Sequence, residues 1–195
     1  MKEYSKKKQQ AIRTKEKIYN SAISLIKEEN YDDVKISDIC KLAKVSVGSF
    51  YHHFDTKDDI IKRIIDEIDI AARENFIDEP NEPLFNSIKR LLLVESKIIE
   101  SYGLKIVTQI AINQLKYGYE YFFNKKWFLE EKLVELLQNH IGSNDIIGNY
   151  STQDISDIVL RTYRGIVIEW CIKRGSLSLY DLVNDHLETQ YINFK

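Results

Sequence analysis

The sequence predicts an all-helical protein with two domains and about nine helices along its 195 residues. Apolar residues recur every three and four positions, which is the spacing of a helix that buries one face. We found no segment with the alternating pattern of a strand. Both prolines fall within Glu79–Pro83, a break that suits a connection between helices. We expect helices at residues of about 10–29, 36–43, 47–53, 57–78, 84–101, 103–120, 125–141, 152–174 and 178–193.

Composition excludes several classes of protein. The net charge of −2 argues against a protein that coats nucleic acid indiscriminately. No uncharged run reaches the roughly 18 residues that a membrane helix needs, and no apolar stretch follows the first lysines as it does in a signal peptide. Cys40 and Cys171 stand far apart, which indicates free thiols in a reducing cytoplasm. We therefore expect a cytoplasmic protein without a membrane partner.

The first 17 residues carry seven basic and two acidic side chains, a net charge of +5. Such a segment can follow DNA phosphates or enter a minor groove, and it can equally be a solvated, frayed terminus. The helix after it has an apolar face made of Ile12, Tyr19, Ala22, Ile23 and Ile26.

The most informative stretch runs from Ile36 to Ile60. We expect Ser37 to cap a helix that buries Ile39, Leu42 and Ala43, and Ser46 to cap a second helix after a turn at residues 44–46. Residues 56–59 read Thr-Lys-Asp-Asp, a capping box that begins the next helix. Helix, tight turn, helix is the arrangement that places its second helix in the DNA major groove.

This stretch resembles the DNA-binding domain of the TetR family of transcriptional regulators. The matching residues are Ser37, Asp38, Ile39, Ala43, Val45, Ser46, Gly48, Ser49, Tyr51, His53, Phe54, Lys57 and Ile60. The resemblance covers about the first third of the chain. Lys44 departs from it, because the family usually has glycine in the turn. A residue other than glycine in the left-handed region costs about 1 kcal/mol, so we expect a slightly different turn.

The second helix of the motif divides into two faces. Phe50 and Phe54 are four residues apart and should pack inward. Base edges are then within reach of Val47, Gly48, Ser49 and His52, and Tyr51 is placed for a phosphate oxygen. The resemblance implies that Tyr51 and Lys57 clamp phosphates, whereas a solvated surface is the plainer alternative. The complete set of predicted DNA-binding residues is Ser37, Ser46, Val47, Gly48, Ser49, Tyr51, His52 and Lys57.

We place the DNA-binding domain at residues 1–56 and a second helical domain at 57–195. The helix expected at about 57–78 connects them, and its apolar stripe is wide enough to face two neighbours (Ile60, Ile61, Ile64, Ile65, Ile68 and Ala72). A further core stripe follows at Leu129, Leu133, Leu136, Leu137 and Ile141.

The last two helices predict a homodimer. One side of the helix at 152–174 carries Ile155, Val159, Tyr163, Ile166 and Trp170, and a second side is apolar as well. A helix that is apolar on two faces must bury both, and a partner subunit can cover the second. A twofold dimer also suits a palindromic DNA site. The predicted interface comprises Ile158, Gly165, Ile168, Ile172, Leu182, His186 and Leu187.

Aromatic residues gather in the middle of the chain. Most can be explained as core packing, but as a group they can line a pocket for a small lipophilic or aromatic effector, as the resemblance implies. The predicted lining is Tyr102, Tyr117, Tyr121, Trp127, Phe128 and Tyr163. Glu95, Glu100 and Glu120 lie nearby. If one of them points inward, a cationic lipophile is favoured, and otherwise a neutral or lipid-like effector.

These observations predict a dimeric repressor that an effector releases from a palindromic operator in double-stranded DNA. The isolated histidines do not suit a metal site, and no nucleophile elbow, phosphate loop or dinucleotide motif is present, so we expect no enzyme activity and no cofactor. A constitutive DNA-binding protein that docks a protein partner is the alternative. A helical enzyme or carrier that uses the motif only structurally ranks last. The sequence leaves open repressor or activator, the effector and the operator.

Overall fold

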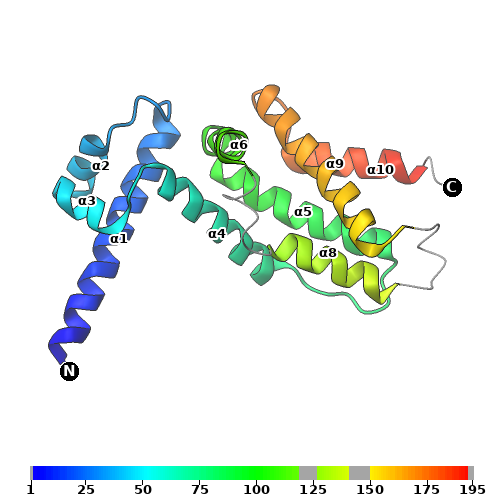
Figure 1. Ribbon diagram of the computed structural model, residues 1–195. Coiled ribbons are helices and arrows are strands. Elements are labelled where there is room, and N and C mark those ends of the chain that lie inside the picture. Colours follow the sequence, from blue (N-terminus) through cyan, green and yellow to red (C-terminus); the bar gives the residue numbers. More distant parts are fainter. Residues whose placement is uncertain (1, 119–126, 141–149, 193–195) are drawn as a thin grey trace. The chain divides into compact units, whose positions relative to one another are not determined.

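The computed structural model describes residues 2–118, 127–140 and 150–192. In these ranges the chain forms nine helices and no strand, which confirms the predicted all-helical class (Figure 1). The helices are α1 (Lys2–Glu28), α2 (Ile36–Ala43), α3 (Val47–His53), α4 (Asp58–Asn75), α5 (Leu84–Tyr102), α6 (Leu104–Tyr117), α8 (Phe128–Asn139), α9 (Thr152–Ile172) and α10 (Leu179–Ile192). No helix in the described ranges is long and apolar enough to span a membrane.

Most predicted helices agree with the structure to within three residues, and α1 is the main exception. It begins at Lys2, about eight residues before the predicted start. The early turns hold mostly lysine and glutamine, which favour a helix without giving it an apolar stripe. Ile12 is accordingly 53% exposed, so its predicted place on the buried face is wrong, whereas Ile18, which we did not predict, is fully buried.

Contacts divide the chain into two compact units, Met1–Ile65 and Asp66–Lys195. The division falls inside α4, whereas the sequence led us to place the domain limit before this helix. α4 is a continuous helix through the division, and its buried isoleucines Ile60, Ile61 and Ile64 belong to the first unit.

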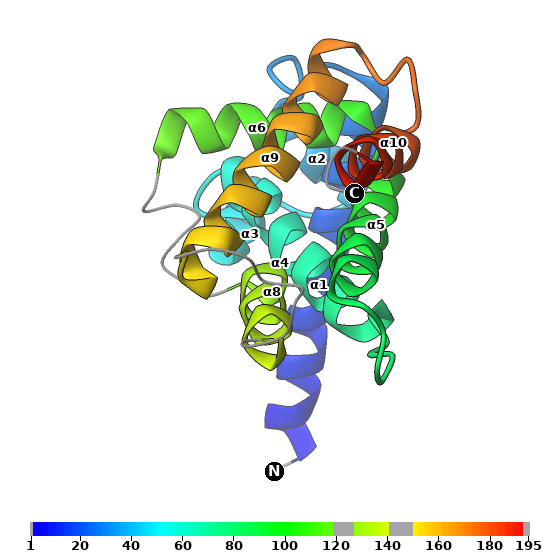
Figure 2. The same cartoon turned by 90° about the vertical axis from the view of Figure 1, so that its right-hand side faces the viewer.

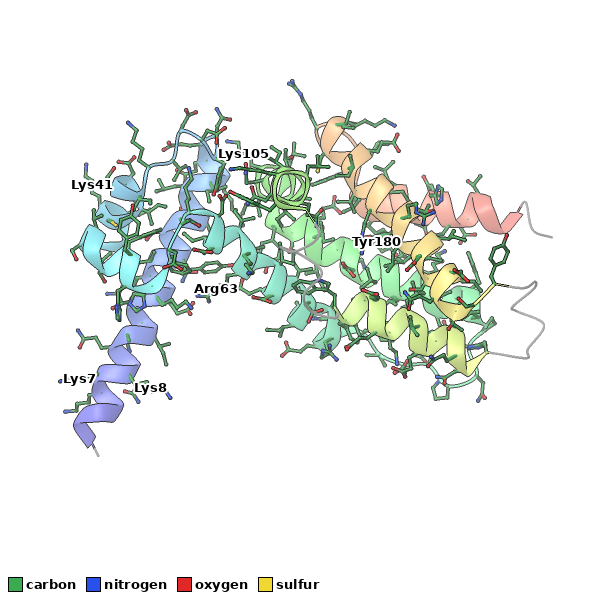
Figure 3. The ribbon with its side chains drawn as sticks, in the orientation of Figure 1. Lys7, Lys8, Lys41, Arg63, Lys105 and Tyr180 are labelled. Carbon is green, nitrogen blue, oxygen red and sulfur yellow. The ribbon has the colours of Figure 1, made fainter. Side chains whose placement is uncertain are left out.

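The first unit packs α1, α2 and α3 against one another around a small apolar core. Its most deeply buried side chains are Ile18, Ile26, Ile39, Phe50, Ile60, Ile61 and Ile64. The first turns of α4 are also held to α1 by Arg63. Its guanidinium lies 2.7 Å from Glu16 and 3.9 Å from the centre of the Tyr19 ring (Figure 3).

The second unit is a bundle in which α5 contacts α6, α8 and α10, and α9 also contacts these three helices (Figure 2). It has two apolar clusters. One is built of Ala72, Phe76, Leu84, Leu91, Phe128, Leu133, Leu136, Leu137 and Leu160. The other is built of Leu92, Leu93, Val107, Tyr163, Trp170, Leu179 and Val183. We call them the first and the second apolar cluster.

Three helices of this unit begin at carboxylates that accept hydrogen bonds from backbone N–H groups. Ser151 and Asp154 form a reciprocal capping box at the start of α9. The Asp69 carboxylate accepts from the backbone N–H of Phe128 at the start of α8. Glu100 accepts from the N–H groups of Leu179 and Tyr180 at 3.2 and 3.4 Å, so it caps α10 from 79 residues away.

Candidate DNA interface and interior of the second unit

The turn between α2 and α3 keeps a left-handed residue although no glycine is present. Lys44 ends α2 at φ 57° and ψ 48°, and the backbone N–H of Val45 donates to the carbonyl of Cys40 at 3.0 Å. Lys44 thus occupies the left-handed region that glycine enters most easily, and the expected difference from the family's turn stays a prediction. Two residues before Lys44, Cys40 and Ala43, are buried and hold α2 in place.

Ser46 begins α3 as predicted. Its hydroxyl oxygen accepts a hydrogen bond from the backbone N–H of Ser49 at 3.1 Å. Phe50 and Phe54 are both buried, with ring centres 5.8 Å apart, which confirms that they anchor the helix inward. The cap uses one acceptor site of the Ser46 oxygen, so the hydroxyl hydrogen remains available as a donor to a DNA phosphate.

The opposite side of α3 is open to solvent. Val47 and Tyr51 are 47% and 53% exposed, Gly48 and His52 are exposed as well, and Ser49 is half-buried. The ring of Tyr51 stands edge-on to buried Phe50, with centres 5.5 Å apart. This packing holds the Tyr51 ring in position. Val47, Gly48, Ser49, Tyr51 and His52 thus form one exposed face on a helix with a rigid base, which we call the α3 face.

Cations in the same unit lie on α1 and α2. Lys41 is an exposed residue in the last turn of α2, and Lys7 and Lys8 project from the first turns of α1 (Figure 3). Because residues 2–28 are helical, the basic segment of the N-terminus is a helix extension and not an extended arm.

Ser37 does not cap α2. The helix begins at Ile36, and Lys35 occupies the cap position without a side-chain hydrogen bond. Leu42, expected on the buried face, is 50% exposed, and Cys40 is buried in addition to Ile39 and Ala43. The cap lies two residues earlier than expected, which leaves Ser37 in the first turn of α2, and its role toward DNA stays a prediction.

Lys57 has a structural role that the sequence did not reveal. Its ammonium group donates to the carbonyl oxygen of Tyr31 and, at 2.7 Å, to that of Val34. The same group lies 4.0 Å from the centre of the Tyr31 ring. Burial lowers the pKa of Lys57, and the nearby carboxylates Asp32, Asp58 and Asp33 oppose this shift. Lys57 therefore ties the start of α4 to the loop after α1, and its phosphate contact stays a prediction.

The capping box at the start of α4 has the predicted geometry. The backbone N–H of Thr56 donates to the Asp59 carboxylate at 2.7 Å, and the N–H of Asp59 donates to the Thr56 hydroxyl at 3.3 Å. The hydroxyl of Tyr31 also donates to Asp58 at 2.6 Å. Together with Lys57, these bonds fix the start of α4.

The residues predicted to line an effector pocket have different surroundings. Phe128 belongs to the first apolar cluster, and Tyr163 belongs to the second, where its hydroxyl lies 3.3 Å from that of Ser96. Tyr102 and Trp127 are half-buried, and Tyr117 is 39% exposed. Tyr121 lies outside the described residues, as do Glu120 and Ile141.

A groove lies between α5 and α10, and none of the predicted lining residues that the structure describes borders it. It is lined by Glu82, Asn86, Lys89, Arg90, Leu93, Val94, Lys97 and Tyr180.

Of the acids considered for a pocket, Glu95 points inward. Its Oε2 atom is closed off from solvent and has no hydrogen-bond partner among the described residues. Burial raises the pKa of Glu95 to about 8, and Asp69 adds to this shift while Arg164 opposes it. Glu100, by contrast, is used as the cap of α10. Both acids were candidates for an inward-pointing carboxyl group in the sequence analysis, and no residue pattern indicated which of them points inward.

The second apolar side of α9 is open in the single chain. Ile158 and Ile172 are 48% and 74% exposed, Gly165 is exposed, and Ile168 is half-buried. On α10, Leu182 and Leu187 pack partly against the second apolar cluster, and His186 is half-buried. Across the described ranges, no three His, Cys, Asp or Glu side chains are grouped so that they could hold a metal ion.

The fold and this motif define an all-helical protein with a helix-turn-helix unit and a separate helical bundle. Residues 18–64 match the family model for bacterial regulatory proteins of the tetR family, and these residues run from α1 into α4. The N-terminal unit is therefore a TetR-family helix-turn-helix domain, which confirms the resemblance read from the sequence.

This chain matches about a quarter of the length of its curated relatives, and several solved structures share its fold. The biofilm-operon negative transcriptional regulator IcaR of Staphylococcus epidermidis is 35% identical over 52 residues, which are 27% of this chain and 28% of IcaR. The fatty acid degradation regulator FadR of Bacillus halodurans has a similar fold, with a TM-score of 0.64, 20% identity and coverage of 90% of this chain and 93% of that one. Thermus thermophilus FadR, a TetR-family repressor solved with lauroyl-CoA, gives a TM-score of 0.63 at 14% identity, over 89% of this chain and 91% of that chain.

Proposed function

We propose that this protein is a sequence-specific DNA-binding transcriptional regulator, acting as a dimeric repressor. The α3 face carries the proposal, because its exposed side chains lie on a capped helix anchored by buried Phe50 and Phe54. A helix of this kind reads base edges in the major groove with its first residues. In this proposal residues 1–56 read DNA, and residues 57–195 bind an effector and dimerise.

The exposed side of α9 supports the dimer. Ile158 and Ile172 leave large apolar surfaces in contact with water, and exposed Gly165 allows a second helix to approach closely. A twofold partner would bury these groups and present two α3 helices about 34–36 Å apart to a palindromic operator.

We further propose that a small molecule in the second unit releases the repressor from DNA. The structurally similar repressor FadR of Thermus thermophilus was solved in complex with lauroyl-CoA, so a protein of this fold can hold a small molecule. Glu95 is half-buried, and its buried and unpartnered Oε2 atom is the polar group that a ligand could satisfy. An effector that prefers one arrangement of the dimer shifts the population toward it, and continuous α4 is the element through which the shift would reach the first unit.

The alternative is a constitutive DNA-binding protein whose second unit docks another protein. This alternative is favoured by the packing of Phe128 and Tyr163 into the apolar clusters, because both residues were predicted to line a ligand pocket. Binding of any small molecule that weakens DNA binding would argue for the effector-controlled repressor.

Selection of bound fragments from genomic DNA by the purified chain, repeated over a salt series, tests the proposal. We expect recovery of a short palindrome, with affinity that falls steeply as salt rises because phosphate contacts release counterions. Failure to enrich any fragment at any salt concentration would contradict the DNA-reading role.

A further inference from the structure

Glu95 is the polar group of the second unit that is hardest to explain by folding alone. Its Oε2 atom is buried and lacks a hydrogen-bond partner within the described residues. Burial of an unpaired charge costs on the order of several kcal/mol, so a carboxyl group in this position stays protonated or awaits a partner. The raised pKa of Glu95, about 8, agrees with a carboxyl group that is largely protonated at neutral pH.

Glu95 lies where the two apolar clusters meet. On α5, one turn before Glu95, Leu91 belongs to the first apolar cluster and Leu92 to the second. On α9, Leu160 belongs to the first apolar cluster and Tyr163 to the second. Glu95 therefore has apolar side chains of both clusters next to it on its own helix.

Other polar groups gather at this junction. The buried hydroxyls of Ser96 and Tyr163 lie 3.3 Å apart, and Ser96 donates to the carbonyl of Leu92 at 2.7 Å. Burial raises the pKa of Tyr163 well above its usual value, and the charge of Glu95 adds to the shift. Ser156, two turns before Tyr163 on the buried face of α9, has a second buried oxygen without a partner among the described residues. A few polar groups within apolar walls are typical of a small-molecule site.

We propose that the effector is a lipophilic organic cation, with its charge against the Glu95 carboxylate and its apolar body between the two clusters. This inference rests on the proposed effector-controlled function. A metal ion fits less well, because no group of three or more metal-binding side chains is present in the described ranges. An anionic ligand is disfavoured by Glu95 and by the buried carboxylate of Asp69.

Binding of a cation should release a proton. The carboxylate is the form that attracts a cation, so affinity should rise with pH until Glu95 is ionised. Three neighbouring groups act on this carboxyl group or respond to it. The charge of Asp69 on α4 raises the pKa of Glu95, and the charge of Arg164 on α9 lowers it. The charge of Glu95 in turn raises the pKa of Tyr163 on α9.

Two probes of the same shape and opposite charge separate this proposal from general apolar binding. Tetraphenylphosphonium is a permanent cation, and tetraphenylborate is an anion of the same size. Calorimetric titration of the full chain at pH 6, 7, 8 and 9 should show binding of the cation and not of the anion. For a carboxyl group with a pKa of about 8, cation affinity should rise roughly fiftyfold from pH 6 to pH 8 and then level off. At pH 6, binding of each cation should release close to one proton from the Glu95 carboxyl group.

Glu95→Gln should abolish the pH dependence and weaken cation binding at pH 8 by about tenfold or more. Glu74→Gln, at an exposed position of α4, is the matched control and should behave as the parent chain. If Glu95→Gln does not fold, the pH series and proton release of the parent decide. Failure to bind the cation, or binding that is the same at every pH, would overturn the proposal. Genomic-fragment selection without ligand, performed on the same preparation, tests the proposed DNA-binding function separately.

Discussion

The ammonium group of Lys57 lies 2.7 Å from the carbonyl oxygen of Val34, 23 residues earlier in the chain. A second hydrogen bond to the carbonyl of Tyr31 makes Lys57 a bridge between α4 and the loop after α1. The same residue is a predicted phosphate clamp, so stability and DNA binding have to be measured separately for its variants.

Lys57→Ala should lower the free energy of unfolding by about 1.5–3 kcal/mol, because two backbone carbonyls lose a charged donor. Urea denaturation followed by circular dichroism measures this loss. Lys41→Ala, at an exposed position of α2, is the control and should change stability by less than about 0.5 kcal/mol. Equal stability of Lys57→Ala and the parent would show that the bridge contributes nothing.

Ser46→Ala should destabilise the first unit by about 0.5–2 kcal/mol, because the backbone N–H of Ser49 loses its cap. Ser46→Thr retains a hydroxyl and should keep most of the stability. Thermal unfolding of the three proteins compares them directly. A Thr variant as unstable as the Ala variant would indicate that the serine acts through something other than the cap.

Ser49→Ala and His52→Ala should relax the preference for particular base pairs by about 1–3 kcal/mol each and leave stability nearly unchanged. His52 is exposed and Ser49 is half-buried, and neither belongs to the buried core, so the folded chain loses little packing. Competition binding against a panel of single-base operator variants provides the measurement. Unchanged preferences at every position would remove both residues from base recognition.

Tyr51→Phe should weaken binding to all DNA sequences alike while the ring keeps its edge-on packing against Phe50. The measurement is affinity for specific and unrelated DNA at several salt concentrations. A loss limited to one sequence would contradict a phosphate contact.

The double variant Ile158→Lys/Ile172→Lys should convert a dimer into a folded monomer, since both side chains are exposed in the single chain. Sedimentation velocity gives the mass in solution, and Ile70→Lys, at a 52% exposed position of α4, is the matched control. A double variant that remains dimeric would place the interface elsewhere.

Glu95 should make the protein less stable as pH rises. The unfolded carboxyl group releases its proton near pH 4.5, whereas the folded one keeps it until about pH 8. The folded state therefore binds more protons in this window, and the free energy of unfolding falls from pH 4.5 to 8. Glu95→Gln should remove this decline, as urea denaturation over the same range can test. A decline of equal size in both proteins would assign it to other groups.

The sequence predicted those features that depend on neighbouring residues. The Ser46 cap and the Thr56–Asp59 box each join residues three apart, so the local pattern contained all the information needed. Phe50 and Phe54 were predicted to be buried for the same reason.

Features that depend on distant residues were missed. The hydrogen bonds of Lys57 and the Glu100 cap of α10 join residues that are 23 to 80 positions apart in the sequence. No pattern of neighbouring residues predicts such bonds. The sequence did not show that Glu95 points inward, because a carboxylate is usually solvated. The start of α1 was missed because exposed turns have no apolar period.

The most direct test of the central claim is fluorescence anisotropy of the purified chain on a selected fragment and on a shuffled fragment of equal composition. We expect affinity for the selected fragment to be at least a thousandfold higher, with both affinities falling as salt rises. Equal affinity for the two fragments at every salt concentration would contradict sequence-specific reading by the α3 face.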